Sequence, residues 1–409
     1  MKGMTNATNN PPVVIYGIEV DSSVSSTPGN VSYTRGALGM SFAQRAELYT
    51  KHIKPCVVSR STGDINYYLD PSNGTKKLDG SSAVLTGADG DVCVCIDTIW
   101  YRTSVNGTKQ SFEFAFKDPS AIGEIGFDCW CHKYGTLTLP YIFAGMFKAT
   151  GNSSACYSVN SSDKPARSMT MYQFETAFKA TGANTSAQYL GLGLPERSLI
   201  GMMLIFLSGS TNSQGFFGNG YVGATSSESN LSATNLGFNA TSMLVSGDTS
   251  ASLSGVMSGF FNNLWGNTWE FLHQCAFNNY KVKTTYLHND HVANITTATY
   301  ATLPSSWYES TSTMASASST GWSYASSFMM SDAPCCTFPR NLGGSTGTYV
   351  YDGIYVNTGA LTDRCVRAGG RLTDGANAGL FALAVANALG YSNWDVGSRL
   401  LIRPIQLAV

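Results

Sequence analysis

The stretch AGGRLTDGANAGLFALAVANALGYSNWDVGSRLLIRP (residues 368–404) decides the fold of this chain. Glycine, alanine and regularly spaced apolar residues form its frame, whereas the side chains between them are of unrelated types. Glycine is the usual residue where a backbone turns tightly or approaches another segment closely. Such a pattern is typical of a rigid scaffold that presents an arbitrary set of side chains. It therefore favours recognition over catalysis.

The composition indicates a folded protein with a polar but weakly charged surface. Of the 409 residues, 43% are hydrophobic and only 12% are charged, which is about half of the usual ~25%. The apolar and aromatic content is too high for a disordered chain. A net charge of −1, with Lys and Arg scattered singly, offers no basic surface to nucleic acid. Extracellular and virion β-rich proteins have surfaces of this kind.

No targeting or membrane-inserting segment is predicted. Residues 1–10 lack the apolar stretch of a signal peptide, and the longest apolar run, residues 199–207, is too short to span a bilayer. The ten cysteines form no paired C-x-x-C zinc pattern. We therefore expect buried free thiols rather than disulfides, in a protein made in a reducing cytoplasm.

The chain divides into three parts. Residues 1–12 are predicted to be a flexible tail. Residues 13–150 form a β-rich N-terminal portion, because β-branched and alternating apolar residues recur between Gly/Asp turns. The strands are expected at residues 13–20, 66–70, 92–102 and 111–118, the last with Phe112, Phe114 and Phe116 on one face. Residues 151–409 form the third part.

Two helices are expected in the third part. One spans residues 170–180, with Thr170 as its N-cap and Gly182 as its stop. The other spans residues 195–208 and should be buried, because it is apolar nearly all round. The Gly/Ser-rich residues 209–258 are predicted to be irregular. Residues 305–333 are also Ser-rich, but their aromatic residues indicate an ordered insertion.

The motif LWGNTWEF (residues 264–271) places a Gly-Asn turn between two tryptophans and a glutamate directly after the second. Trp265 and Trp269 can bury large aromatic areas, and Asn267 can bond its own backbone in a turn. Glu270 then becomes a partly buried carboxylate that needs hydrogen-bond donors. It could be catalytic or bind metal, but a core corner with a satisfied carboxylate is the preferred interpretation.

Other candidate sites are weaker. His288 and His291 could bind metal, but a third ligand is not evident, so surface histidines on a loop are favoured. His132 lies beside Cys129 and Cys131 and could bind a soft metal, although core thiols next to a strand end are favoured. No nucleophile elbow or phosphate-binding glycine loop occurs. We therefore predict no catalytic residue, no metal and no cofactor.

Three motifs resemble the formylglycine-generating-enzyme branch of the C-type lectin fold. WGNTWEF (residues 265–271) is similar to the GNVWEW element of that branch, RCVRAGG (residues 364–370) to its R-V-x-R-G-G-S-W strand, and NWDVGSRL (residues 393–400) to its closing IGFR strand. The resemblance implies an α+β, C-type-lectin-like fold with insertions over residues 151–409. Cys335, Cys336 and Cys365 do not occupy that branch's catalytic motif positions, so its oxidase activity is not carried over.

A closer resemblance is to the variable proteins of diversity-generating retroelements, of the phage receptor-binding type. Their C-termini have the pattern GG…GxNAGLFAL…NA…SNWxxGxRL, matched here from Gly369 to Leu400. In that family a reverse transcriptase rewrites adenines, so Asn codons become codons for many other residues. The alanines of residues 379–388 favour a helix, whereas the alternation of Phe381, Leu383 and Val385 with alanine favours a strand. The resemblance implies a strand over residues 379–385, with these three side chains inward.

The resemblance assigns roles to individual residues within the variable region at about 345–400. The implied ligand-binding positions are Tyr349, Tyr351, Asp352, Tyr355, Arg371, Thr373, Asp374, Ala384, Ala386, Tyr391 and Asp395. The implied scaffold positions are Trp265, Gly266, Asn267, Trp269, Glu270, Gly369, Gly370, Trp394, Gly397 and Arg399. Tyrosine suits a binding patch because it offers a large, rigid contact area at low entropy cost.

The expected function is non-covalent capture of a host cell-surface protein or glycan, by a receptor-binding protein of a phage tail fibre. Its other partners would be virion tail proteins. A homotrimer is one assembly that such a role allows. A bacterial cell surface is the alternative location. Two further alternatives stay open: a metal-dependent enzyme of the formylglycine-generating type, and a structural virion or cell-surface protein without a variable site.

Overall fold

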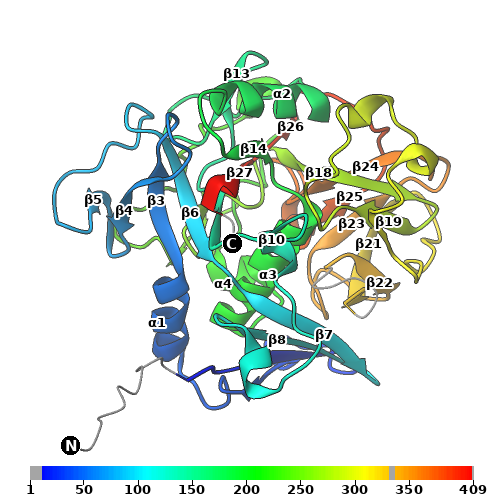
Figure 1. Ribbon diagram of the computed structural model, residues 1–409. Helices are drawn as coiled ribbons and strands as arrows, with labels where there is room; N and C mark the ends of the chain where they lie inside the picture. The colour runs from blue at the N-terminus through cyan, green and yellow to red at the C-terminus, as the bar shows by residue number, and fades with distance from the viewer. Residues whose placement is uncertain (1–11, 331–336, 408–409) are drawn as a thin grey trace, which may run out of the picture.

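The computed structural model describes residues 12–330 and 337–407 and shows a mixed α+β protein built mostly from strands, which confirms the expected class. Three sheets surround the central helix α3 (Leu194–Ser208) (Figure 1). The tail expected at residues 1–12 lies outside the described residues except for Pro12, and so do Cys335 and Cys336.

A seven-stranded sheet joins segments from both ends of the chain. Its order is β14-β27-β11-β6-β3-β4-β5. The bounds are Gln188–Gly191 (β14), Leu400–Arg403 (β27), Tyr141–Gly145 (β11), Asp91–Asp97 (β6), Ile53–Val58 (β3), Ile65–Asp70 (β4) and Asn73–Lys77 (β5). The predicted division at residue 150 remains a prediction, but strands from both sides of it share this sheet. The C-terminal strand β27 is an interior strand of this sheet, because β14 and β11 flank it on either side.

A nine-stranded sheet carries the C-terminal motifs. Its order is β20-β19-β18-β24-β25-β23-β21-β22, and β26 pairs with β18. The bounds are Tyr308–Glu309 (β20), Lys281–Thr284 (β19), Trp269–Asn278 (β18), Arg364–Ala368 (β24), Leu383–Ala384 (β25), Gly353–Val356 (β23), Gly321–Phe328 (β21), Pro339–Leu342 (β22) and Val396–Gly397 (β26). The strand expected around residues 379–385 is therefore only two residues long, although Phe381, Leu383 and Val385 are all buried.

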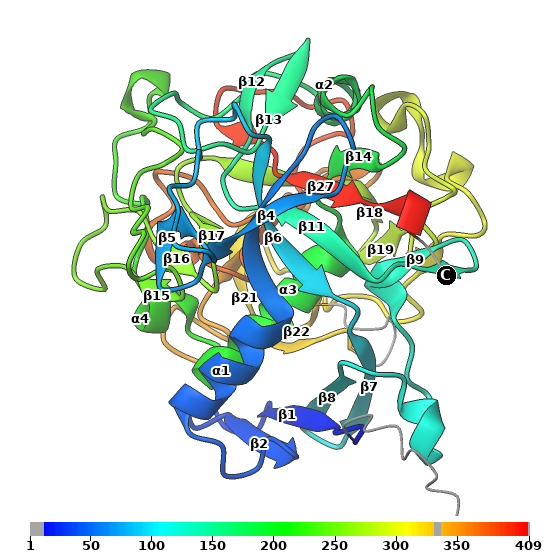
Figure 2. The ribbon, with the colours of Figure 1, turned by 60° about the vertical axis from the view of Figure 1, so that its left-hand side comes forward.

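A third, four-stranded sheet has the order β2-β1-β8-β7 and packs below the other two (Figure 2). The bounds are Val31–Arg35 (β2), Tyr16–Asp21 (β1), Lys109–Ala115 (β8) and Trp100–Asn106 (β7). One expectation was wrong here, because residues 92–102 are not one strand. The chain leaves β6 at Asp97 and enters β7 at Trp100, which carries it from one sheet to another.

The described residues also form three small sheets, three more α-helices and seven short 3-10 helices. The small strands are Lys133–Tyr134 (β9) with Leu137–Thr138 (β10), Thr150–Asn152 (β12) with Ala155–Tyr157 (β13), and Val245–Ser246 (β15), Met257–Ser258 (β16) and Phe261–Asn262 (β17). The other helices are Phe42–His52 (α1), Met171–Thr181 (α2) and Ser213–Phe217 (α4). Helix α2 has Thr170 as N-cap and Gly182 as C-cap, as predicted. Helix α1 was not expected, although its capping box of Ser41 and Gln44 is a local signal.

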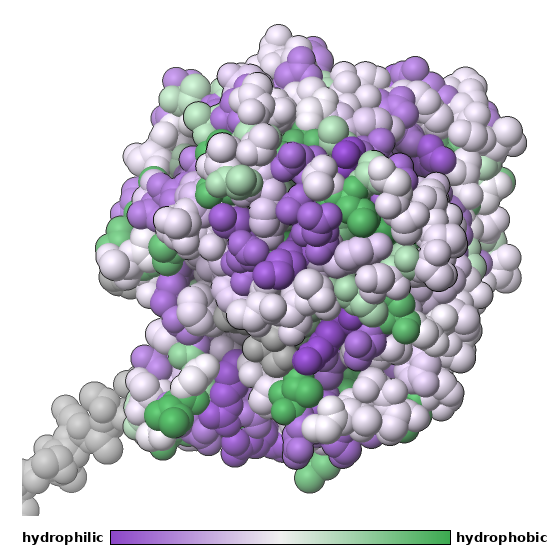
Figure 3. Space-filling model, turned by 90° about the vertical axis from the view of Figure 1, so that its right-hand side faces the viewer, coloured by the Kyte–Doolittle hydropathy of each residue, from purple (hydrophilic) through white to green (hydrophobic). Residues whose placement is uncertain are grey.

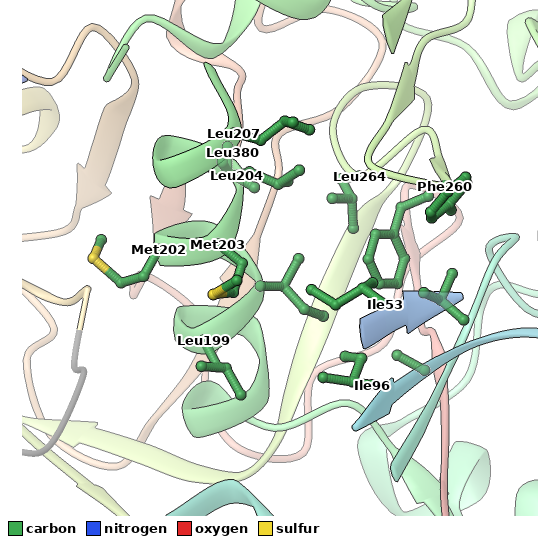
Figure 4. Close-up of a cluster of buried hydrophobic side chains, with 14 of the residues drawn as sticks. Ile53, Ile96, Leu199, Met202, Met203, Leu204, Leu207, Phe260, Leu264 and Leu380 are labelled. Atoms are coloured by element: carbon green, nitrogen blue, oxygen red, sulfur yellow. The ribbon is translucent and has the colours of Figure 1, made fainter. Parts of the chain in front are cut away.

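Helix α3 is the centre of the largest apolar cluster. Every residue from Leu194 to Leu207 is buried, which confirms the expectation for this helix. In Figure 4 its leucines and methionines lie among side chains from β3, β6 and the 260–264 turn, including Ile53, Ile96 and Phe260. Each such side chain contributes roughly 1.5–3 kcal/mol by leaving water. This packing holds the seven-stranded sheet against helix α3.

The surface and the cysteines agree with the composition. On the face at the right of Figure 1, hydrophilic and intermediate residues dominate, and hydrophobic residues form small separate patches (Figure 3). The eight described cysteines are all buried, as expected of interior thiols. Within the described ranges, none of the helices combines the length and apolar composition needed to cross a bilayer.

Candidate functional site

A buried ion cluster anchors the C-terminal motifs to the rest of the fold. Glu270 follows Trp269 at the start of β18 and is 1% exposed. One of its oxygens lies 2.7 Å from Arg399 Nη2 and 2.7 Å from Lys148 Nζ, and the other accepts a 3.2 Å hydrogen bond from Arg399 Nε. Burial alone would raise the pKa of Glu270, but Arg399 and Lys148 lower it to about 2. The carboxylate is therefore ionised and fully engaged, as a structural group would be.

Arg399 also joins backbone segments that are far apart in sequence. Its guanidinium donates to four carbonyl oxygens, those of Gly145, Met146, Asn262 and Asn263, at 2.7–3.1 Å. Burial lowers the pKa of Lys148 to about 8, although Glu270 opposes this effect. Charge-assisted bonds of this kind are the stronger hydrogen bonds in proteins. The cluster therefore holds β27, β18 and the 262–263 turn in one geometry.

Two glycines allow the backbone of the RCVRAGG motif to approach Leu264 and Ala378 closely. Gly369 has a φ of +90°, and a Cβ there would lie 2.5 Å from the carbonyl oxygen of Leu264. Gly370 has a φ of +79°, and a Cβ there would lie 2.6 Å from the Cβ of Ala378. Only glycine tolerates both the left-handed conformation and these contacts. The turn Gly266-Asn267 is also left-handed, with φ of +76° and +63°.

A cavity of about 250 Å³ opens on one face of the nine-stranded sheet. Directly opposed residues of paired strands point to the same face. Trp322 on β21 pairs with Tyr355 on β23, Tyr355 with Ala384 on β25, and Ala384 with Arg367 on β24. The full lining is Trp269, Trp322, Tyr355, Arg367, Arg371, Asp374, Ala384, Asn387, Tyr391 and Asp395.

Aromatic rings form the walls of this cavity. The rings of Trp269 and Trp322 are stacked, with centroids 6.1 Å apart, and Tyr355 meets Trp322 edge-on at 5.4 Å. The guanidinium of Arg367 lies between two rings, 5.3 Å from Trp269 and 5.0 Å from Tyr391. Cation–π contacts at these distances are attractive. The walls are consequently rigid and amphipathic.

A charged group occupies the other side of the cavity. Arg371 forms an ion pair with Asp395, and its Nε lies 3.5 Å from Asp374 Oδ1. Burial raises the pKa of Asp374, while its bonds to Arg371 oppose that shift. Among the described residues, three buried atoms of side chains that line the cavity have no hydrogen-bond partner: Nε of Arg367, Nε of Arg371 and Oδ1 of Asp395. Such groups gain free energy when a ligand that shifts the side chain supplies a partner.

The structure brings some of the predicted binding positions together and separates others. Tyr355, Arg371, Asp374, Ala384, Tyr391 and Asp395 line the cavity. Tyr351 and Asp352 line a different hollow of about 200 Å³, beside Asn212 and Gln214. Tyr349, Thr373 and Ala386 line neither, and the backbone carbonyl of Tyr349 accepts a hydrogen bond from Asn30 Nδ2. Of the predicted scaffold positions, Trp269 also lines the cavity.

Asp352 is an interior group rather than an exposed contact. It is 2% exposed, and its carboxylate accepts hydrogen bonds from Ser213 Oγ and from the backbone N–H of Phe381 at 2.8 Å. Burial raises the pKa of Asp352 to about 7, although these bonds oppose the shift. Arg197 also opposes the shift, but burial is the larger effect, because a carboxyl group removed from water takes up a proton more readily.

We predict that Asp352→Asn raises the free energy of unfolding above pH 7, by about 1–2 kcal/mol. The folded-state pKa is raised, so the native protein carries more protons than the unfolded chain between about pH 3.8 and pH 7. The stability contributed by this group is therefore lost as the pH rises through that window, and asparagine avoids the loss. Urea unfolding at pH 4 and pH 8 tests this. A gain of equal size at both pH values would contradict it.

Three lining residues were predicted neither as binding nor as scaffold positions: Trp322, Arg367 and Asn387. Arg367 lies within the quoted RCVRAGG motif, and Asn387 within the quoted NA pair, so both carried a signal. Trp322 belongs to the Ser-rich stretch of residues 305–333, whose aromatic residues indicate an ordered insertion but no binding role. Its pairing with Tyr355 across strands is a tertiary fact that no local pattern contains.

The histidines differ from expectation in one respect. His288 is 2% exposed and lies 3.2 Å from Glu196 through its Nε2, so the loop that carries it turns inward. It was expected at the surface. His132 is buried and its Nε2 contacts the carbonyl oxygen of Ile96, beside interior thiols as expected. Among the described residues, no group of three His, Cys, Asp or Glu side chains is arranged to hold a metal ion.

Comparison with solved structures finds similarity to a chain named Major Tropism Determinant U1 Variant. The two chains are 11% identical, the match covers 96% of this chain and 73% of that chain, and the TM-score is 0.30. No protein-family model and no curated protein matches. At this TM-score the similarity carries no argument, so the proposals below rest on the residues of this chain.

Proposed function

We propose that this chain is a receptor-binding protein whose cavity captures a molecule on a host cell surface. Residues 151–409 would form a C-type-lectin-like domain with insertions, and the region at about 345–400 would be diversified by a retroelement. The protein would act in a phage tail fibre, beside other virion tail proteins. Its role is binding, without catalysis.

One observation carries the proposal: three of the predicted swappable side chains are partly exposed in one cavity, whereas two of the predicted scaffold side chains are buried in an ion cluster. Tyr355, Arg371 and Tyr391 are partly exposed and share one cavity. Glu270 and Arg399 are buried beneath the same sheet and tie its backbone to distant segments. Side chains of the first kind can change at low cost in stability, whereas those of the second kind cannot.

The small size of the site favours an assembly that displays several copies of it. A cavity of about 250 Å³ buries little of a macromolecular partner, so a single contact would be weak. Display of several copies, in a trimer or on several fibres, would raise the overall affinity by roughly 10²–10⁴ through effective concentration. Light scattering of the purified protein would establish the number of chains.

We predict that a variant with four cavity substitutions, Tyr355→Ser, Arg371→Ser, Tyr391→Ser and Asp395→Asn, stays folded. The free energy of unfolding should fall by less than about 2 kcal/mol, because Tyr355, Arg371 and Tyr391 are only partly buried and both charges of the Arg371–Asp395 pair are removed together. Urea unfolding measures this. The matched control replaces Trp269, which also lines the cavity but belongs to the scaffold, and Trp269→Ser should cost about 3–5 kcal/mol. Equal losses in the two variants would contradict the proposal.

The DNA beside the gene tests the retroelement. We expect a near-copy of the 3′ end of the gene that differs chiefly at adenines, next to a gene for a reverse transcriptase. The differences should fall at the codons of cavity residues and spare those of the buried ion cluster. Sibling genes whose differences are as frequent at Glu270 and Arg399 as at Tyr355 and Tyr391 would overturn the proposal.

A further inference from the structure

Arg367 is a buried cation with no anionic partner among the described residues. It is 5% exposed, and no carboxylate of the described chain lies within 4.0 Å of its guanidinium. It donates one hydrogen bond, from Nη2 to Asn387 Oδ1, and its Nε has no partner. Removing a charge from water without a counter-charge is costly, and the contacts with Trp269 and Tyr391 offset that cost only in part.

The other charged residues of the cavity do not supply the missing anion. Two arginines and two aspartates line the cavity, so its formal charge is balanced. However, both Asp374 and Asp395 bond to Arg371. Arg371 is therefore paired with both aspartates, whereas Arg367 has no carboxylate within 4.0 Å among the described residues, so an entering anion competes with fewer carboxylates at Arg367.

We propose that the cavity binds an acidic saccharide unit, with the sugar carboxylate on Arg367 and the ring against the aromatic walls. This inference rests on the proposed function and deepens it, because it selects a glycan over a protein as the ligand. A guanidinium and a carboxylate match each other in geometry and charge. Arg367 Nε would complete its hydrogen bonding in this contact.

The remaining features of the cavity fit a sugar ring rather than a bare carboxylate. The edge-on pair of Trp322 and Tyr355 presents apolar surfaces, against which the C–H face of a pyranose packs. Oδ1 of Asp395 lacks a donor and can accept a hydrogen bond from a sugar hydroxyl. An unpaired donor, an unpaired acceptor and an aromatic wall are together satisfied by a ligand that carries a carboxylate, hydroxyls and a ring.

The test titrates the whole protein with glucuronate, glucuronamide, glucose and acetate, and follows tryptophan fluorescence and the indole N–H signals in NMR spectra. Glucuronamide is the matched ligand control, because it keeps the ring and removes the charge. We expect glucuronate to bind at least 10-fold more tightly than glucuronamide, glucose or acetate. Arg367→Gln should reduce the glucuronate affinity at least 10-fold, whereas Arg364→Gln, on the same strand but outside the cavity lining, should not.

Each outcome decides the proposal. Equal binding of glucuronate and glucuronamide would overturn it, and this comparison needs no variant, so misfolding of Arg367→Gln cannot obscure it. Acetate bound as tightly as glucuronate would point to a carboxylate side chain of a protein and would also overturn it. Failure of the proposed function is read separately from the neighbouring DNA, since absence of a template copy would leave selective binding of glucuronate intact.

Discussion

Replacement of Arg399 by methionine is expected to lower the free energy of unfolding by about 3–5 kcal/mol, because it breaks a buried ion pair and leaves its partner in place. Arg399 is 0% exposed and bonds both oxygens of Glu270. The variant leaves that carboxylate with Lys148 as its closest cation and deprives four backbone carbonyls of a donor. The loss should appear in urea unfolding at pH 7 as a lower midpoint with an unchanged slope.

The control is the same substitution at an exposed arginine. Arg35 has a side chain that is 43% exposed and pairs with Glu113 and Glu124. Exposed ion pairs contribute about 0–1 kcal/mol, so Arg35→Met should change the free energy of unfolding by less than that. A double variant, Arg399→Met with Glu270→Leu, should recover part of the loss, because it removes the stranded carboxylate. An Arg399→Met variant as stable as Arg35→Met would show that the stability of the fold does not depend on the ion cluster of Glu270, Arg399 and Lys148.

Acidification from pH 6.5 toward pH 3 is expected to destabilise the protein by several kcal/mol. Burial lowers the pKa of His132 to about 4 and that of His291 to about 3, and it lowers the pKa of His288 well below the usual value of 6.5. The unfolded chain therefore binds more protons than the native protein across this range. The stability is present above about pH 6.5 and is lost as the pH falls toward the folded-state values. Burial raises the pKa values of Asp352, Asp91, Glu196 and Asp374, which act in the opposite direction, whereas the lowered pKa of Glu270 adds to the loss at the acid end of this range.

The contribution of one histidine can be isolated by substitution. His132 is 0% exposed, so His132→Gln should remove about 2–3 kcal/mol of the pH-dependent loss between pH 6.5 and pH 4. The measurement is the free energy of unfolding at half-unit pH intervals, for the unmodified protein and the variant. The comparison variant is His52→Gln, at a side chain that is 20% exposed. Parallel pH profiles for the unmodified protein and His132→Gln would contradict the prediction.

The elements that the sequence predicted best are those specified by neighbours along the chain. Helix α2 begins after Thr170 and ends at Gly182 as expected, because its capping box involves residues only three positions apart. The burial of α3 follows from its uniformly apolar composition. The turn at Gly266-Asn267 and the burial of Glu270 likewise follow from a motif of eight residues.

The errors arose where two segments distant in sequence decide the outcome. Residues 92–102 have a continuous strand pattern, yet β6 and β7 belong to different sheets. The reason is that β6 pairs with residues 53–58 and β7 pairs with residues 109–115. The segment around His288 is polar, as an exposed loop would be, yet His288 is buried and lies 3.2 Å from Glu196. No local pattern records which partner is available.

By itself the sequence determined the α+β class, the two helices and the burial of Glu270, because short-range bonding and total apolar content specify them, whereas the scaffold role of Arg399 came from the family resemblance and Lys148 was not predicted. Only the tertiary structure decided which side chains share the cavity. Trp322, Tyr355, Ala384 and Arg367 become neighbours through the pairing of four strands, whereas Asp352 is buried by contacts with Ser213 and Phe381. Register and burial depend on the packing of distant segments, and that packing is a property of the folded chain.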